Sequence, residues 1–161
     1  MPKKCIDIVK FQKVRQKDPL GCILVNLEIA LKYYGESRYD EQELIKHTIG
    51  NALSFPNIPR LLNPILENHK IKFKSFRGNL RKLRRYFKKK VNKQIPILLA
   101  FNNPDGSAHT KTIICYENSH FHAYDPADGT IRDYSELEFE NEIIPGDYHA
   151  LFLKRKSKNR I

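Results

Sequence analysis

The apolar residues of this chain follow two different spacings, and the change from one to the other constrains the fold more than any other feature. From residue 22 to residue 69 they recur at the three- and four-residue intervals of amphipathic helices. From residue 71 onward most segments alternate apolar and polar residues, or form short apolar runs, as strands do. This order predicts an α+β domain, with N-terminal helices packed on a mostly antiparallel β-sheet.

Four helices are expected, and local residues mark their ends. Gly35 follows the first helix and would end it, while Asp40 would cap the start of the second. Pro64 falls inside the third, where proline is tolerated only in a first turn or at a kink. The expected helices cover residues 22–34, 40–49, about 57–69 and 79–90.

Two of the five expected strands would form a hairpin. If residues 110–116 and 120–124 pair through a three-residue loop, His109 lies diagonal to Asp125 on the same face. Such neighbours are about 7–8 Å apart, within reach of an imidazole–carboxylate hydrogen bond. A two-residue loop would shift the register by one and place the two side chains on opposite faces. The other expected strands cover residues 71–76, 95–101 and 149–153.

Length and composition predict one folded domain over residues 1–161, with a core of about residues 10–153 and a frayed basic tail at 154–161. The 40% hydrophobic and 11% aromatic content suits a packed core. No apolar run is long enough to span a bilayer, and the N-terminus lacks a signal sequence. The three widely spaced cysteines predict neither a disulfide framework nor a zinc site. We therefore expect a cytoplasmic, reduced protein.

The net charge of +11 is distributed unevenly. Residues 70–94 carry twelve Lys or Arg and no acid, whereas residues 117–147 carry nine acids and one basic residue. We favour a solvated helix face as the explanation of the basic stretch. The alternative is a non-catalytic module that binds nucleic acid or an acidic protein, and it would depend on Arg84, Arg85 and Lys88.

Cys22 is the candidate nucleophile, because it follows a turn-forming run and opens the first helix. A thiol at a helix N-terminus is stabilised as thiolate by the helix dipole. His109 could accept its proton, and Asp125 could orient the imidazole, which together make an arrangement for acyl transfer. Taken singly, the three residues have ordinary explanations: a small buried side chain, a surface histidine and a turn aspartate.

An oxyanion formed in acyl transfer needs hydrogen-bond donors fixed in advance. The backbone N–H of Cys22 can supply one, and the side-chain amide of Gln16 can supply another. Gln12 is a competing candidate for the second donor.

The run from Gln16 to Gly35 resembles the start of the bacteriocin-processing peptidases that remove double-glycine leaders, a family of papain-like cysteine peptidases. That family has a glutamine, five residues, the nucleophilic cysteine and a helix that ends in an aromatic–glycine pair. Here these are Gln16, Cys22 and the pair Tyr34-Gly35. Downstream, His109 at the start of a strand and the run Tyr124-Asp125-Pro126 resemble the family's base and orienting acid.

The resemblance extends over about residues 10–153 and implies a papain-like fold in a stand-alone domain. It further implies that Cys22, His109, Asp125 and Gln16 cleave a peptide or protein substrate through a thioester, without a cofactor. Cleavage after small residues such as Gly-Gly is also implied by the resemblance alone. An acyl or amide transferase with the same thiol chemistry is the alternative.

The chain departs from the family pattern beside the proposed catalytic residues. The family usually has Asp before the cysteine and Gly or Ala after it, where this chain has Gly21 and Ile23. Thr110 stands after the histidine, where an aromatic residue is common. These changes affect the walls of the site, so they bear on substrate preference more than on reaction type.

The sequence gives little support for a metal site. His120 and His122 alternate in one strand with Cys115 near in sequence, but their spacing matches no metal-binding motif. We therefore expect no metal.

Overall fold

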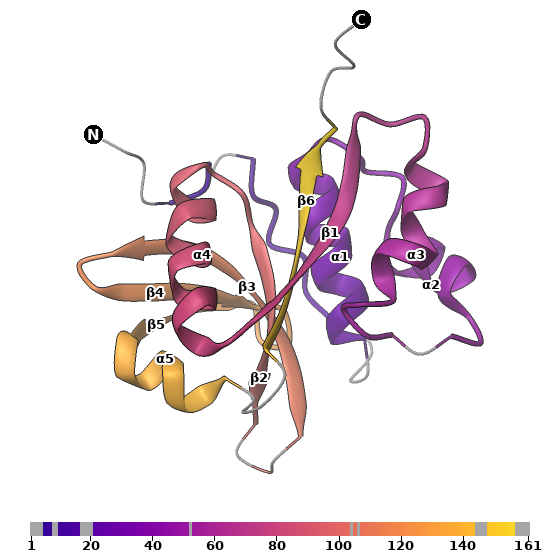
Figure 1. The fold of residues 1–161 in the computed structure, drawn as a ribbon. Helices are drawn as coiled ribbons and strands as arrows, with labels where there is room; N and C mark the ends of the chain where they lie inside the picture. The colour runs from indigo at the N-terminus through magenta and orange to yellow at the C-terminus, as the bar shows by residue number, and fades with distance from the viewer. Residues whose placement is uncertain are drawn as a thin grey trace, which may run out of the picture.

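The computed structural model describes residues 5–7, 10–16, 21–51, 53–103, 105, 107–143 and 148–156. In this part of the chain, helices dominate before residue 70 and strands after it (Figure 1). The elements, in chain order, are α1 (Cys22–Tyr33), α2 (Glu41–Thr48), α3 (Ile58–Leu62), the 3₁₀ helix η1 (Asn63–Leu66), β1 (Ile71–Gly78), α4 (Leu80–Asn92), β2 (Ile97–Asn102), β3 (Ala108–Glu117), β4 (His120–Asp125), β5 (Thr130–Ser135), α5 (Glu136–Glu142) and β6 (Tyr148–Arg155).

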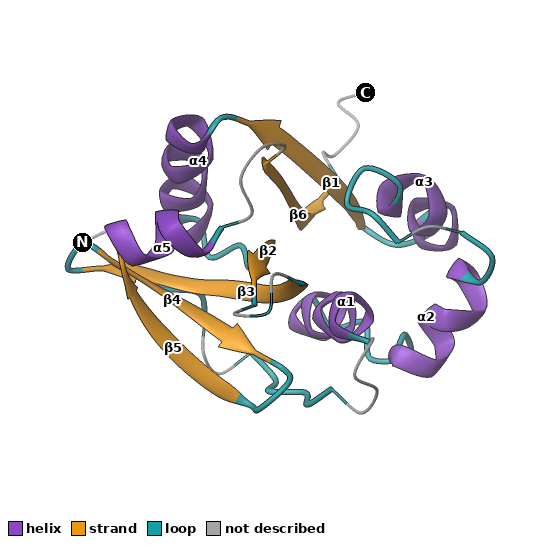
Figure 2. Cartoon of the chain, turned by 90° about the horizontal axis from the view of Figure 1, so that it is seen from below, coloured by secondary structure: helices purple, strands orange, loops and turns teal. Residues whose placement is uncertain are grey.

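The six strands form one antiparallel sheet in the order β1-β6-β2-β3-β4-β5. Helices cover both of its faces: α1 lies on one face with α2 and α3 beyond it, and α4 and α5 lie on the other (Figure 2). The architecture is the α+β arrangement expected from the sequence.

Apolar side chains on the two faces of the sheet form separate cores. The core on the α1 side joins α1, α2 and α3 to β1, β2 and β6, with Leu27, Leu62 and Leu98 fully buried. The core on the other side joins α4 and α5 to β2–β5, with Phe87 and Phe139 at its centre. Burial of such side chains stabilises each by roughly 1.5–3 kcal/mol relative to exposure. The sheet is therefore held from both sides.

The helix predictions are confirmed for α1, α2 and α4 and need correction for the third helix. Gly35 adopts the left-handed φ of +88° after α1, and the Asp40 carboxylate accepts a hydrogen bond of 2.8 Å from the Glu43 N–H at the start of α2. In place of one helix over 57–69, the chain forms the short α3 and then η1, with Pro64 in the first turn of η1. Proline has no N–H to continue the α-helical ladder, so the helix breaks there.

Strand β5 and helix α5 were not anticipated from the sequence. Only Tyr134 is fully buried in β5, so the strand lacks the apolar alternation that marks a half-buried strand. The start of α5 did carry a signal. Ser135 and Glu138 form a reciprocal capping box, whose Ser-x-x-Glu pattern is readable in the sequence.

The β3–β4 hairpin differs from its predicted form at the turn but not near His109. Glu117 pairs with His120, so the loop has two residues, and both adopt positive φ as a type I′ turn requires. Alone, this turn would have moved His109 to the wrong face. A β-bulge between Ile113 and Cys115 shifts the register back, so that Thr112 pairs with Tyr124. The expected diagonal relation of His109 to Asp125 is thereby restored.

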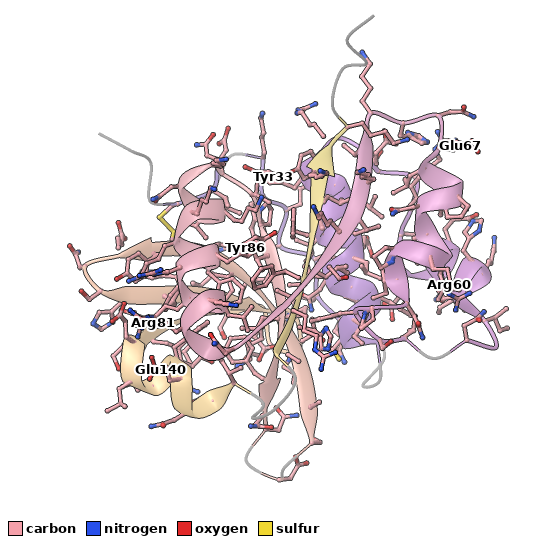
Figure 3. All side chains as sticks on the ribbon, viewed as in Figure 1. Tyr33, Arg60, Glu67, Arg81, Tyr86 and Glu140 are labelled. Carbon is pink, nitrogen blue, oxygen red and sulfur yellow. A yellow bond between two sulfur atoms is a disulfide. The ribbon has the colours of Figure 1, made fainter. Side chains whose placement is uncertain are left out.

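The prediction that the cysteines form no disulfide is wrong. Cys5 and Cys115 face each other in an isolated antiparallel bridge and are joined by a disulfide, the yellow bond in Figure 3. This pairing could not be predicted from the sequence, because an isolated bridge next to a bulge follows no local sequence pattern. Cytoplasmic location stays a prediction, but the cysteines no longer argue for it, because disulfides are rare in reducing compartments. Within the described residues, no helix is long and apolar enough to cross a membrane.

The C-terminal strand extends further than expected. β6 pairs with both β1 and β2 and includes Lys154 and Arg155, which the sequence assigned to a frayed tail. Residues 157–161, the rest of that predicted tail, lie outside the described residues.

Candidate active site

Cys22 is the first residue of α1 and lies half-buried between the helices and the sheet. Gly21 precedes it as the N-cap and offers no side-chain cap. The first amides of the helix have no partner within the helix, and the positive end of the helix dipole lies at the residue that carries the thiol. Cys22 is also the chain's one free thiol, because the other two cysteines form the disulfide.

His109 enters strand β3 next to the thiol and is only 8% exposed. Its Nε2 lies 2.5 Å from Oδ1 of Asp125, and its imidazole also interacts with the Cys22 side chain. The structure thus brings together three side chains that are up to 103 positions apart in the sequence, from Cys22 to Asp125.

Asp125, at the end of β4, is held by several partners in addition to His109. Its Oδ1 accepts a 2.9 Å hydrogen bond from the Ala127 N–H, and Lys111 Nζ lies 3.9 Å from Oδ2. Burial raises the pKa of the carboxyl, but the hydrogen bonds from His109 and Ala127 outweigh this effect and lower it overall. Asp125 is therefore an anion over the whole neutral range.

The thiol and the imidazole shift each other's proton affinity in opposite directions. Burial raises the pKa of Cys22, but hydrogen bonds from His109 and from the backbone and hydroxyl of Thr110 lower it below its ordinary value. The hydrogen bond to Asp125, and then that to Cys22, raise the pKa of His109 to about 9. At neutral pH this geometry favours a thiolate beside an imidazolium.

Asn26 joins the helix that carries the thiol to the strand that carries the imidazole. Its fully buried amide Nδ2 donates to the carbonyl oxygens of Cys22 at 2.6 Å and Thr110 at 2.8 Å. Its Oδ1 accepts a 2.6 Å hydrogen bond from the Thr112 hydroxyl. Because the bonds to Thr110 and Thr112 are buried, separating α1 from β3 would leave their polar groups unsatisfied.

Gln16 lies on the segment that packs against the turn after Asp125. Its backbone N–H donates to the Pro126 carbonyl at 2.8 Å, and the Tyr124 hydroxyl donates to the Val14 carbonyl at 2.9 Å. The side chain of Gln16 is half-buried, whereas that of the competing Gln12 is exposed. Residues 17–20, which connect Gln16 to the start of α1, lie outside the described residues.

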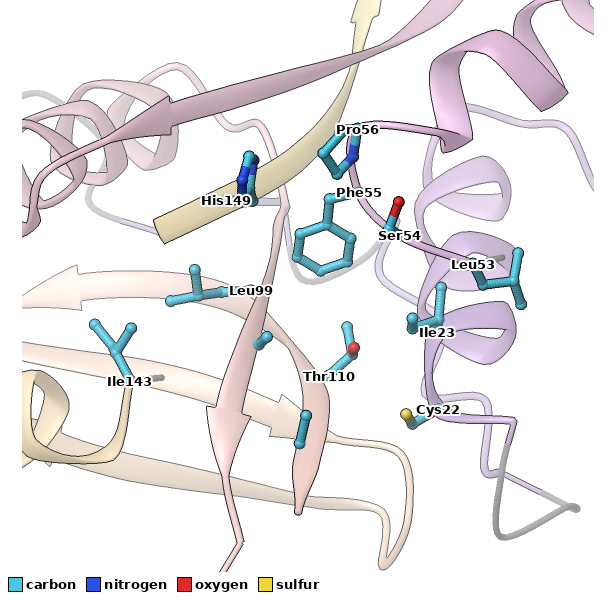
Figure 4. A pocket seen from close by; sticks show the side chains of 12 residues that line it. Cys22, Ile23, Leu53, Ser54, Phe55, Pro56, Leu99, Thr110, Ile143 and His149 are labelled. Carbon is cyan, nitrogen blue, oxygen red and sulfur yellow. The ribbon is translucent and has the colours of Figure 1, made fainter. Parts of the chain in front are cut away.

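An apolar cleft of about 240 Å³ runs from Cys22 between the helical layer and the sheet. Cys22 and Thr110 lie at one end, and Ile143 and His149 lie toward the other (Figure 4). Most of the remaining wall comes from the loop before α3 and from β2 and β3: Ile23, Leu53, Ser54, Phe55, Pro56, Leu99, Ala100 and Ala108. An extended chain with apolar side chains could lie here with its backbone beside the thiol.

Sequence reasoning missed three residues that contact the reactive groups: Asn26, Lys111 and the hydroxyl of Thr110. Lys111 is buried, and its ammonium donates to the Tyr134 hydroxyl at 2.7 Å behind Asp125. A lysine in the middle of an apolar strand was a readable signal, because buried lysines are nearly always paired. Asn26 gave no such signal, because the same helix also carries the polar residues Glu28 and Lys32.

The two strand histidines lie in β4 beside Asp133 and are not among the residues that line the cleft. His120 Nδ1 is 2.8 Å and His122 Nε2 is 3.8 Å from the Asp133 carboxylate. Within the part of the chain that the structure describes, no three His, Cys, Asp or Glu side chains are arranged to hold a metal ion.

The helical layer, the antiparallel sheet and a thiol–imidazole–carboxylate cluster at their junction give the chain the papain-like α+β fold. No protein-family model matches the sequence, and no curated protein matches it. Solved structures of peptidase domains do share the fold.

Three such structures align with nearly the whole chain. One is a C39-like peptidase from Bacillus anthracis, at 16% identity and a TM-score of 0.70, covering 96% of this chain and 99% of the other. Another is the peptidase domain of Streptococcus ComA, a bifunctional ABC transporter of a quorum-sensing pathway. It is 17% identical, has a TM-score of 0.62, and the alignment covers 89% of this chain and 97% of the other. The third is a double-glycine-motif protease from an AMS/PCAT transporter, solved in complex with the leader peptide. It is 18% identical, has a TM-score of 0.60, and the alignment covers 89% of this chain and 90% of the other. This chain therefore has the fold of these peptidase domains.

Proposed function

We propose that this chain is a cysteine peptidase, with Cys22 as nucleophile, His109 as general acid and base, and Asp125 as the orienting residue. The observation that carries the proposal is that the Cys22 thiol interacts with His109, whose imidazole is hydrogen-bonded to Asp125, at the end of an apolar cleft. The fold shared with double-glycine peptidase domains supports the same reaction class.

The Cys22 thiolate would attack the carbonyl carbon of the scissile peptide bond and form a tetrahedral oxyanion. The backbone N–H of Cys22 and the side-chain amide of Gln16 would donate hydrogen bonds to that oxygen. The His109 imidazolium would then give its proton to the departing amine nitrogen, leaving a thioester on Cys22. Water, deprotonated by the neutral imidazole, would hydrolyse the thioester and restore the thiolate–imidazolium pair.

A peptide cut after a Gly-Gly pair is the proposed substrate class. The double-glycine-motif protease with the same fold was solved with a leader peptide bound. In this chain Ile23 and Thr110 line the cleft together with Cys22, and residues without large side chains at the scissile bond would fit between them. The apolar remainder of the cleft would take up side chains of the leader on the N-terminal side.

The first test is the pH profile of Cys22 alkylation by iodoacetamide. The wild-type chain should react rapidly below neutral pH, and H109A should lose this acid-shifted reactivity, because the thiolate loses its cationic partner. No other free thiol contributes to the signal. Labelling that rises only above about pH 8.5, as for an ordinary thiol, would overturn the proposed ion pair.

The second test is hydrolysis of a synthetic leader peptide that contains Gly-Gly before the scissile bond. Wild-type protein should release the leader, whereas C22S should not. A matched peptide with Val-Val at the same place is expected to remain intact. An added amine separates the transferase alternative, because a transferase would form the amide product in preference to the free acid.

A further inference from the structure

The basic stretch at residues 70–94 divides into two parts with different surroundings. On the side of α4 that faces α5, Arg84 lies 2.7 Å from Glu140, and Lys88 lies 2.8 Å from Glu136. Two of the cations that the sequence singled out are therefore neutralised by the acidic segment of the same chain. This part of the basic stretch forms ion pairs between α4 and α5.

The other part has no such compensation. Lys72 of β1 and Lys154 of β6 are direct cross-strand partners, and Lys74 follows on the same face of β1. Like charges placed directly opposite each other destabilise a sheet. Within the described residues, no ion pair joins any of these three lysines to a carboxylate. Their mutual repulsion is therefore left in place.

Helix α4 adds a further cation to the same place. The Lys90 ammonium lies 4.6 Å from the ring centre of Phe152 and 5.1 Å from that of Tyr86, which is labelled in Figure 3. Burial, and then the charges of Lys93, Lys89, Lys74 and Lys154, lower the pKa of Lys90. The charges of Lys74 and Lys72 likewise lower the pKa of Lys154. Four lysines thus repel one another at one edge of the sheet.

This lysine cluster, made of Lys72, Lys74, Lys90 and Lys154, borders a polar pocket of about 370 Å³. Lys154 belongs to both. The pocket lies between the end of α1, the turn after α4 and the end of β6, and its lining residues are Lys10, Tyr33, Tyr34, Lys93, Gln94, Ile95, Lys154 and Arg155. Its lining has four cations and no acid. The potential inside such a concave site is strongly positive, because low-dielectric walls focus the field.

We propose that this pocket and the lysine cluster bind a compact anion that carries several phosphate groups. Bound phosphates would neutralise the repulsion between the ammonium groups of Lys72 and Lys154. Lysine ammonium groups are suitable hydrogen-bond donors for phosphate oxygens. The site is distinct from the cleft at Cys22, since the two share no lining residue.

A compact ligand fits these observations better than a membrane or a nucleic-acid duplex. Among the described residues, the large exposed apolar side chains are Ile45, Ile49, Ile131 and Leu137. They lie outside the pocket and the lysine cluster, so none of them would insert into a bilayer at this site. The cations converge on a pocket, whereas a duplex presents its phosphates along a long convex surface.

The test uses tripolyphosphate as the probe, with calorimetric titration and thermal melting in a low-salt buffer free of phosphate. Wild-type protein should bind the probe, and K72Q/K154Q should bind it at least about tenfold more weakly. Without the probe, K72Q/K154Q should melt at a higher temperature than wild type, because a like-charge pair is removed. The difference should shrink as salt is added.

R81Q/R85Q is the matched control, with the same loss of charge on exposed positions of α4. It should bind the probe as wild type does, and so should C22A, whatever the outcome for peptidase activity. Equal loss of binding in R81Q/R85Q would overturn the proposal, as would a lower melting temperature for K72Q/K154Q. Binding of a DNA duplex or of vesicles containing phosphatidylglycerol, without binding of tripolyphosphate, would overturn the assignment to a compact anion.

Discussion

Replacement of Asp125 by Asn tests whether the carboxylate sets the protonation of His109. The hydrogen bond to Asp125 is the largest of the effects that raise the pKa of His109 to about 9. At pH 8 an imidazole with that pKa is about 90% protonated, whereas one with the ordinary value of 6.5 is about 3% protonated. The hydrogen bond with Cys22 persists in D125N. We therefore expect a fraction between these limits and a midpoint lowered by at least about one pH unit.

The assay is a pH titration of the ¹⁵N-labelled imidazole of His109 by NMR, supported by alkylation of Cys22 with iodoacetate. Iodoacetate is an anion, so its reaction with the thiolate is helped by a neighbouring imidazolium and declines when that group loses its proton. D128N is the control, since Asp128 lies in the same turn and accepts its hydrogen bonds from Thr130. A midpoint that stays near 9 in D125N, or falls as far in D128N, would refute the assignment of Asp125 as the orienting acid.

Three further changes test other contacts of the site. T110V removes a hydroxyl that lowers the pKa of Cys22, so the acid limb of the iodoacetamide profile should move to higher pH while the circular dichroism spectrum stays unchanged. N26L leaves the carbonyl groups of Cys22 and Thr110 without their buried donor and should lower the free energy of unfolding by about 3 kcal/mol, measured in urea; N26L protein as stable as wild type would contradict the role given to this amide. C5S/C115S opens a loop spanning 110 positions and should lose about 5 kcal/mol in the same assay, and a loss below about 1 kcal/mol would mean that the disulfide does not constrain the unfolded chain.

The candidate catalytic residues could be read from the sequence because each belongs to a local pattern. Cys22 opens a helix rich in apolar residues, and Asp125 ends a strand at a turn. The distance between His109 and Asp125 depended on a hairpin register that local patterns do not fix, and that between Cys22 and His109 depended on the packing of α1 against β3. The predicted loop was one residue too long, and the bulge between Ile113 and Cys115 cancelled that error. The register at the site was thus predicted correctly for an incomplete reason.

Other features of the molecule have no local cause in the sequence. The Cys5–Cys115 disulfide and the Lys72–Lys154 opposition arise from pairings between strands that are distant in the chain. Asn26 looked like any polar residue on a helix until its partners on β3 were known. Such groups are determined by tertiary contacts, so periodicity and turn signals cannot reveal them.

The division of the site between two layers has a consequence for how reactivity is acquired. Helix α1 supplies the sulfur, while β3 and β4 supply the imidazole and carboxylate, so neither half of the chain is reactive by itself. The appearance of acid-shifted alkylation of Cys22 during refolding can therefore report when α1 packs against the sheet. This reactivity would begin only when the helix packs on the sheet. It would be lost before the secondary structure if the two halves separate while each keeps its own helices and strands.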